Sequence, residues 1–128
     1  VDNLDKVWNE QYQTYLGVQV PDDKRGVLQD VHWCEGLLGY FPTYSLGSFY
    51  SAQFYATAKA HTPNLEAEIA KGNHKPLLDW LRANIHQHGR FYTPNELCKQ
   101  ATGEYLNIDY FMEYVREKFG QIYEPVLA

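Results

Sequence analysis

Apolar side chains recur at the spacing of an α-helix through most of this chain, and this periodicity restricts the fold more than any other feature of the sequence. The pattern is clear over residues 2–16, 74–88 and 107–122, where apolar residues share one side of each expected helix. No clear run alternates apolar and polar residues in the manner of a half-buried β-strand. The sequence therefore predicts an all-α fold.

Several helix boundaries are marked by residues that begin or end helices for physical reasons. Thr93-Pro94-Asn95-Glu96 combines a capping threonine, a proline suited to the first turn and a glutamate that completes a capping box. Asn107 is expected to cap the last helix. Glycines are expected to end three of the helices, at Gly17, Gly89 and Gly103.

Composition and charge exclude several classes of protein. The chain has 128 residues, no internal repeat and no linker, so we expect a single helical unit over residues 1–128. A net charge of −5 argues against a nucleic-acid partner, because phosphate contacts need clustered Lys and Arg. No apolar run approaches the roughly 20 residues that cross a bilayer, so we expect no membrane partner. The chain opens with Val1 and without the layout of a signal peptide, and we interpret it as a processed or excised segment.

The segment from Gly26 to Gly47 differs from the rest of the chain. It mixes apolar residues with Gln29, Asp30, His32 and several aromatic residues, and Gly36, Gly39 and Pro42 interrupt its periodicity. Burial of such polar groups is costly unless each one is paired. We therefore interpret this segment as the candidate site, followed by a helix over about residues 43–59.

Gln29-Asp30-x-His32-Trp33 is the first pattern in this segment. Asp30 is placed to accept a hydrogen bond from His32 and so to fix its tautomer, which leaves the other ring nitrogen for a substrate or an acid–base task. The alternative is a buried polar cluster that only holds the loop in shape.

Tyr40-Phe41-Pro42-Thr43-Tyr44 is the second pattern. A tyrosine hydroxyl is a neutral donor at pH 7, suited to a developing oxyanion or to a substrate carboxylate. The alternative is an aromatic contribution to the core.

Cysteine and histidine spacing gives no metal site. Cys34 and Cys98 form neither a disulfide framework nor a paired metal motif, and they fit a reducing, cytoplasmic compartment. His86 and His88 are two apart, so on a helix they do not share a face. No histidine is followed by glutamate, so the zinc-peptidase motif of two histidines four apart is absent.

Two motifs together resemble the thermostable carboxypeptidase (carboxypeptidase Taq) family of zinc metallopeptidases. Gly26-x-x-Gln29-Asp30-x-His32-Trp33 is similar to a signature motif of that family, and residues 39–47 are similar to the segment that follows it. The resemblance extends to Val7-Trp8-Asn9-Glu10 near the start and to Ala101-Thr102-Gly103-Glu104 near the end. Cys34 departs from the family's pattern, which more usually has a small hydroxyl residue there.

The resemblance implies a helical, cytosolic and usually homodimeric peptidase, much longer than this chain, that removes single residues from peptide C-termini. It implies zinc, or another divalent metal, bound by residues of the full-length parent that this chain lacks, so we expect the chain alone to bind no metal and to be inactive. We expect His32 and Tyr44 to be catalytic, and we expect four residues to bind or orient the peptide substrate: Tyr40, Gln29, Asp30 and Trp33. Expected partners are the substrate, the remainder of the parent peptidase and a second copy. The alternative is a non-catalytic helical interaction or dimerisation module.

Overall fold

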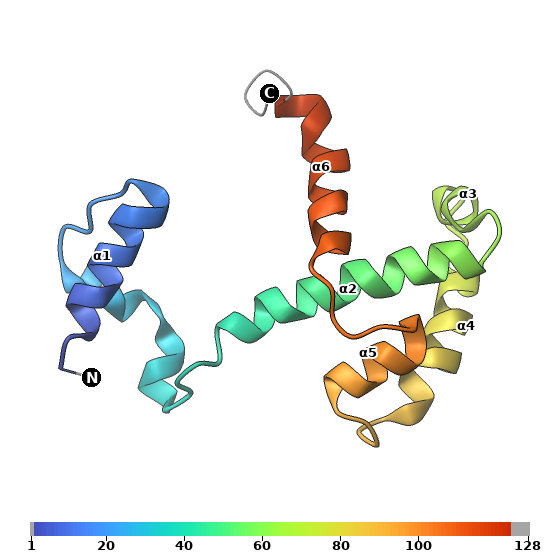
Figure 1. The fold of residues 1–128 in the computed structure, drawn as a ribbon, viewed down its shortest axis with the longest axis horizontal. Coiled ribbons are helices and arrows are strands. Elements are labelled where there is room, and N and C mark those ends of the chain that lie inside the picture. The colour runs from blue at the N-terminus through green and yellow to red at the C-terminus, as the bar shows by residue number, and fades with distance from the viewer. Residues whose placement is uncertain (1, 124–128) are drawn as a thin grey trace. The chain divides into compact units, whose positions relative to one another are not determined.

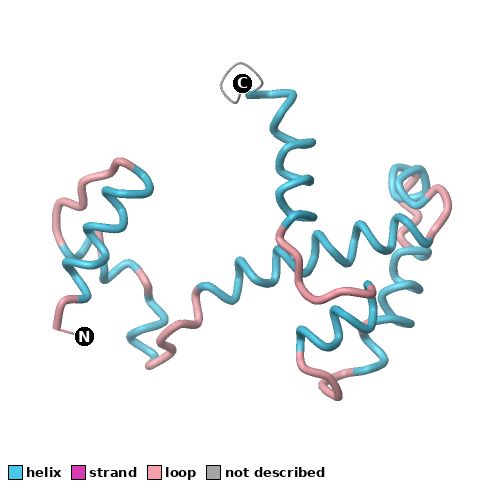
Figure 2. The backbone as a smooth tube through the Cα atoms, viewed as in Figure 1, coloured by secondary structure: helices cyan, strands magenta, loops and turns pink. Residues whose placement is uncertain are grey.

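The protein is all-α, as the periodicity predicts. A computed structural model describes residues 2–123, and within that range the chain forms helices and loops without a β-strand (Figures 1 and 2). The chain divides into two compact units, Val1–Thr43 and Tyr44–Ala128. The expected single unit over residues 1–128 stays a prediction, and its ends at residues 1 and 124–128 lie outside the described residues.

The first unit is one α-helix with the following segment folded back along it (Figure 1). α1 spans Leu4–Leu16 and ends where predicted, since Gly17 adopts the left-handed conformation (φ 65°) and donates its amide to Gln13 O. Three short 3-10 helices follow it: η1 (Asp23–Arg25), η2 (Val27–Gln29) and η3 (Val31–Glu35). Val27 is the buried apolar residue of this unit.

The second unit is organised around the long helix α2, Pro42–His61. It is followed by α3 (Leu65–Ala70), α4 (Lys75–Asn84), the short η4 (His86–His88), α5 (Pro94–Thr102) and α6 (Asp109–Tyr123). The edge of the Phe111 ring in α6 packs on Phe49 of α2, with ring centroids 5.0 Å apart. The buried apolar residues of this unit are Ala58, Leu65 and Cys98.

Most predicted helix boundaries are confirmed. The capping box at the start of α5 is present, because Glu96 N donates to Thr93 Oγ1 and the Glu96 carboxylate accepts from Thr93 N. The Thr93 hydroxyl, which also donates to this carboxylate at 2.7 Å, and the Thr93 amide hold the pKa of Glu96 below its usual value. Asn107 Oδ1 accepts the amide of Asp109 at the start of α6, at 3.0 Å.

The helix predicted over residues 74–88 is shorter than expected. α4 ends at Asn84, and a separate 3-10 turn leads to Gly89. Asn84 Nδ2 donates to the carbonyl of Trp80 at 2.8 Å, and such a side-chain bond competes with continuation of the backbone ladder.

A fully buried glutamine links distant parts of the second unit. Gln53 of α2 donates from Nε2 to Thr102 Oγ1 (3.0 Å) and Tyr105 O (3.2 Å), and its Oε1 accepts from Asn107 N (2.9 Å). These bonds connect the middle of α2 to the end of α5 and to the loop before α6. A buried amide is stable only when its donors and its acceptor are paired, so the position of this loop is tied to α2.

Large apolar side chains remain exposed along the segment in which the sequence analysis places the site. Four clear examples are Val31, Leu38, Phe41 and Tyr44. Isolated exposed apolar residues are normal in any protein, but contiguous ones indicate a surface that contacts something else. None of the helices within residues 2–123 is long and apolar enough to cross a bilayer.

Gln53→Leu is expected to lower the free energy of unfolding of the second unit by roughly 2–4 kcal/mol, because the Asn107 amide and the Tyr105 carbonyl lose their buried partner. Urea denaturation followed by circular dichroism measures this change. Gln100→Leu, at an exposed position of α5, is the matched control and is expected to stay within about 0.5 kcal/mol of the parent sequence. Equal effects of the two substitutions would contradict the linking role of Gln53.

The two cysteines are expected to differ in reactivity. Cys98 is fully buried and burial raises the pKa of its thiol, whereas Cys34 is exposed. In the folded chain a thiol reagent should therefore modify Cys34 and spare Cys98, and both thiols should react in denaturant. Mass spectrometry of the peptides after labelling checks this, and rapid native labelling of Cys98 would contradict the structure around α5.

Candidate active-site segment

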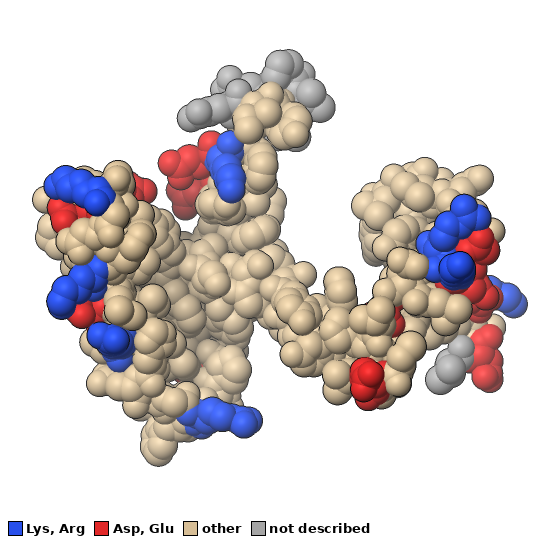
Figure 3. All heavy atoms as spheres, turned by 180° about the vertical axis from the view of Figure 1, so that it is seen from behind, with Lys and Arg blue, Asp and Glu red and all other residues tan. Residues whose placement is uncertain are grey.

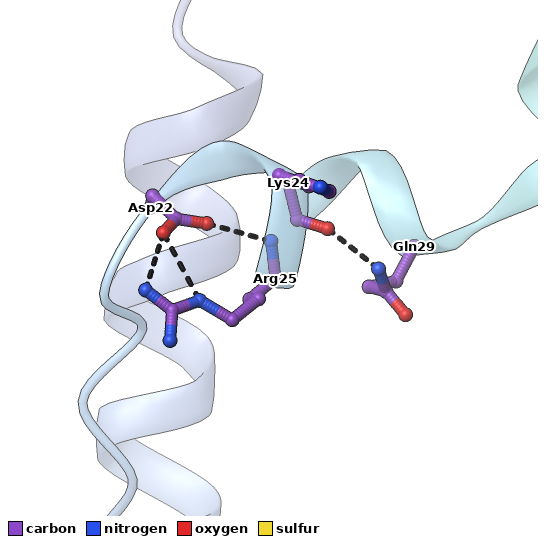
Figure 4. Close-up of polar contacts among 4 residues, drawn as sticks. All are labelled: Asp22, Lys24, Arg25 and Gln29. Atoms are coloured by element: carbon purple, nitrogen blue, oxygen red, sulfur yellow. Dashed lines mark hydrogen bonds and ion pairs between the residues drawn. The ribbon is translucent and has the colours of Figure 1, made fainter.

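The segment begins with a tight loop held by an ion pair. Asp22 caps η1 by accepting the amide of Arg25, and its other carboxylate oxygen contacts Arg25 Nη2 at 2.6 Å (Figure 4). The Arg25 side chain holds the pKa of Asp22 below its usual value. Gln29 Nε2 donates to Lys24 O at 2.5 Å, and its carbonyl oxygen points away from the loop (Figure 4). The amide nitrogen of Gln29 therefore bonds within the segment.

Asp30 and His32 form the pair that the spacing predicts. Asp30 caps η3 by accepting the amide of His32 (3.1 Å), and the same Oδ1 lies 2.7 Å from His32 Nδ1. Both side chains are more than four-fifths buried. A carboxylate accepts hydrogen bonds, so the hydrogen of this contact belongs to Nδ1. The pair fixes both the tautomer and the orientation of the ring.

Aromatic rings surround the histidine and support the segment. The His32 ring lies 5.0 Å from the Tyr40 ring and 5.5 Å from Phe41, between centroids. Trp33 packs edge-on against Trp8 of α1 at 5.9 Å, and Trp8 in turn stacks on Tyr12. The segment is thus attached to α1 through Trp33, while His32 contacts the residues that lead into α2.

Tyr44 lies in the first turn of α2 and belongs to the second unit. Its side chain is 60% exposed, and its carbonyl accepts a hydrogen bond from Ser48 Oγ at 3.2 Å. Tyr40 precedes the helix, and its carbonyl accepts both the amide and the hydroxyl of Thr43 at the start of α2. The structure thus brings Asp30, His32 and Tyr40 together within the first unit and presents Tyr44 on the helix that follows.

The remaining histidines do not form a metal site. His61 Nδ1 lies 2.9 Å from the Thr57 carbonyl, and His86 and His88 lie in the short η4 turn. Among residues 2–123, no group of three or more His, Cys, Asp or Glu side chains is arranged to hold a metal ion.

Two packing features of the first unit involve residues that the sequence analysis named only as parts of motifs. Gly26 is buried, and a methyl group there would overlap Val20 Cγ1 and approach Asp22 O. Trp8 Nε1 and Asn9 Oδ1 are buried without a hydrogen-bond partner among the described residues. The first glycine of the motif is therefore a position of close packing, a role that only the three-dimensional structure shows.

Comparison with known proteins identifies the family of the chain. Residues 1–119 match the family described as Carboxypeptidase Taq (M32) metallopeptidase. Thermostable carboxypeptidase 1 of Thermus thermophilus is 44% identical over 122 residues, which cover 95% of this chain and 24% of the relative. The crystal structure of an M32 carboxypeptidase from Deinococcus radiodurans superposes with a TM-score of 0.88 at 43% identity, covering 96% of this chain and 25% of that one. A solved structure described as CHT is 58% identical, with a TM-score of 0.86, over 92% of this chain and 24% of that one.

The described residues form an all-helical protein in which a partly buried aspartate–histidine pair lies against the ring of Tyr40. The chain belongs to the carboxypeptidase Taq (M32) family of metallopeptidases. It spans about a quarter of the length of the curated relatives that it matches.

Gly26→Ala is expected to destabilise the first unit by roughly 1–3 kcal/mol, because the added methyl group has no room against Val20. Thermal unfolding monitored by tryptophan fluorescence reports on this unit through Trp8 and Trp33. Gly120→Ala is the control, since open space surrounds that position in α6 and alanine favours a helix by up to about 1 kcal/mol over glycine. An unchanged melting temperature for Gly26→Ala would contradict the packing described around the motif.

Proposed function

We propose that this chain is part of a metal-dependent carboxypeptidase and that it supplies the side chains that bind the C-terminal end of the peptide and stabilise charge during its hydrolysis. The observation that carries the proposal is the buried Asp30–His32 pair, in which one ring nitrogen is fixed by the carboxylate at 2.7 Å. Family membership and the names of the relatives as carboxypeptidases support the reaction class.

His32 acts through Nε2 in this proposal. The neutral ring accepts a hydrogen bond there and the protonated ring donates one, so the residue suits a substrate carboxylate or a developing oxyanion. Asp30 is a positioning residue that holds the tautomer, and Gln29 and Trp33 hold the segment to its own loop and to α1. We propose that these two residues affect the substrate by fixing the shape of the segment.

Tyr44 and Tyr40 supply neutral hydroxyl donors in this proposal. We choose Tyr44 as the donor to the carbonyl oxygen of the scissile peptide, which gains charge during hydrolysis. Tyr44 is the more exposed of the two tyrosines, at 60% against 44% for Tyr40. Tyr40, whose ring contacts His32, is our choice for the terminal carboxylate of the peptide.

The metal belongs to the part of the peptidase outside this chain. The family's description as metallopeptidases implies a divalent ion, which we propose to be zinc, and the described residues offer no ligand set that fits it. When bound, the metal would supply Lewis-acid chemistry at the scissile peptide. We also propose a cytoplasmic homodimer, since the free cysteines Cys34 and Cys98 fit a reducing compartment and the resemblance implies a dimer.

Tyr44→Phe in the full-length peptidase is expected to lower kcat at least about tenfold, because an oxyanion donor acts on the chemical step. The fold should survive, since the ring is retained. His32→Ala is expected to lower kcat/KM, with some loss of stability because Asp30 loses its partner. Steady-state kinetics and thermal melts on the same variants test both expectations.

Tyr15→Phe is the matched control, since Tyr15 is an exposed tyrosine of α1 that has no proposed role in the reaction. Asp30→Asn tests positioning separately, because an amide no longer forces the hydrogen onto Nδ1, and the pH profile of kcat/KM should change with it. A normal kcat for Tyr44→Phe would remove Tyr44 from the site. Lower melting temperatures with normal kinetics for His32→Ala would favour the non-catalytic interaction module.

A further inference from the structure

Helix α2 mixes apolar residues with small polar ones and carries almost no charge. It contains a single residue among Lys, Arg, Asp and Glu, namely Lys59, in twenty residues, and the surface along it is almost uncharged (Figure 3). A surface helix usually carries charged residues on its exposed face, so a helix with so few of them is expected to be largely covered. One side of α2 meets this expectation, since Gln53, Thr57 and Ala58 are buried within the second unit. The other side is not covered by the described residues.

The open side of α2 forms a groove with α6. Its α2 wall is made largely of small residues, Ser48, Ser51, Ala52 and Ala56, and its α6 wall is aromatic, with Tyr110 and Tyr114. The cavity volume is about 1100 Å³. The axes of two packed helices are roughly 8–10 Å apart, and small side chains at the contact allow the shorter of these distances. The dimensions and lining therefore suit an α-helix.

The charges that line this groove are unbalanced. Lys59 is paired with Glu66 at 2.7 Å, and Lys118 donates to the hydroxyl of Tyr114. Glu113 and Glu117 also line the groove, one turn apart on α6, so the lining carries three carboxylates against two ammonium groups. Acidic side chains gather along α6 in the view from behind (Figure 3). An occupant with Lys or Arg facing these two carboxylates would complement them.

We propose that this α2–α6 groove holds an α-helix from the part of the peptidase that lies outside this chain, with a small or apolar face toward α2 and a Lys or Arg toward Glu113 and Glu117. The inference rests on the proposed function, in which the chain is one part of a longer peptidase. Relatives about four times as long as the aligned region supply enough chain for such a helix. A two-fold dimer through the groove is disfavoured, because it brings the same acidic rim of each copy together.

Photo-cross-linking in the full-length peptidase tests this proposal. The photo-reactive residue p-benzoylphenylalanine replaces Tyr55, which lines the groove and is similar in size and shape. We expect an intramolecular adduct whose mass spectrum identifies a helical segment outside these 128 residues, with a basic residue near the site of attachment. The same probe in place of Phe91, an exposed residue outside the groove, should give no such adduct. Glu113→Lys combined with Glu117→Lys should abolish most of the adduct at position 55.

Three results would overturn the proposal: an adduct confined to residues 44–123, an adduct between two copies in a mixture of isotopically light and heavy protein, and no adduct at all. Carboxypeptidase activity and metal content of the same preparation separate this inference from the proposed function. An active peptidase with any of these three results contradicts only the docked helix. A preparation without activity or metal contradicts the proposed function itself.

Discussion

The chain buries very little apolar surface of its own, and this constraint governs the rest of the structure. Within the described residues the buried hydrophobic side chains are Val27, Ala58, Leu65 and Cys98, whereas large apolar residues stay exposed on α1, α2, α4 and α6. Burial of apolar surface is the main favourable term in folding. Polar anchors therefore set much of the internal geometry within the described residues, and in the proposed peptidase the remaining protein would cover the exposed apolar surface.

Two such anchors define the geometry. Gln53 ties α2 to the end of α5 and to the loop before α6, so the second unit is specified by one fully paired amide. In the first unit Asp30 fixes His32, and Gly26 permits the close approach of the segment to its own loop. A network that is fully paired gives a unique local structure, and a site built on it is oriented before the substrate binds.

Local chemistry explains which parts of this structure are readable from the sequence. The capping box at Thr93 and the Asp30–His32 pair each join residues two or three apart, so spacing alone predicts them. Gln53 bonds to residues about fifty positions away, and nothing near it in the sequence marks it as a linking residue. The packing at Gly26 depends likewise on Val20 across a turn. In the proposed function, the choice between Tyr40 and Tyr44 depends on where the rest of the peptidase places the peptide, which this sequence does not encode.

The central claim is that this segment faces the substrate in a metallocarboxypeptidase. A crystal structure of the full-length peptidase with its metal and a non-hydrolysable C-terminal peptide analogue tests it most directly. The account predicts His32 Nε2 and the Tyr44 hydroxyl at about 3 Å from oxygen atoms of the analogue, with Asp30 still bonded to Nδ1. The opposite result, in which both side chains contact only protein and the analogue is held entirely by other residues, would contradict the account.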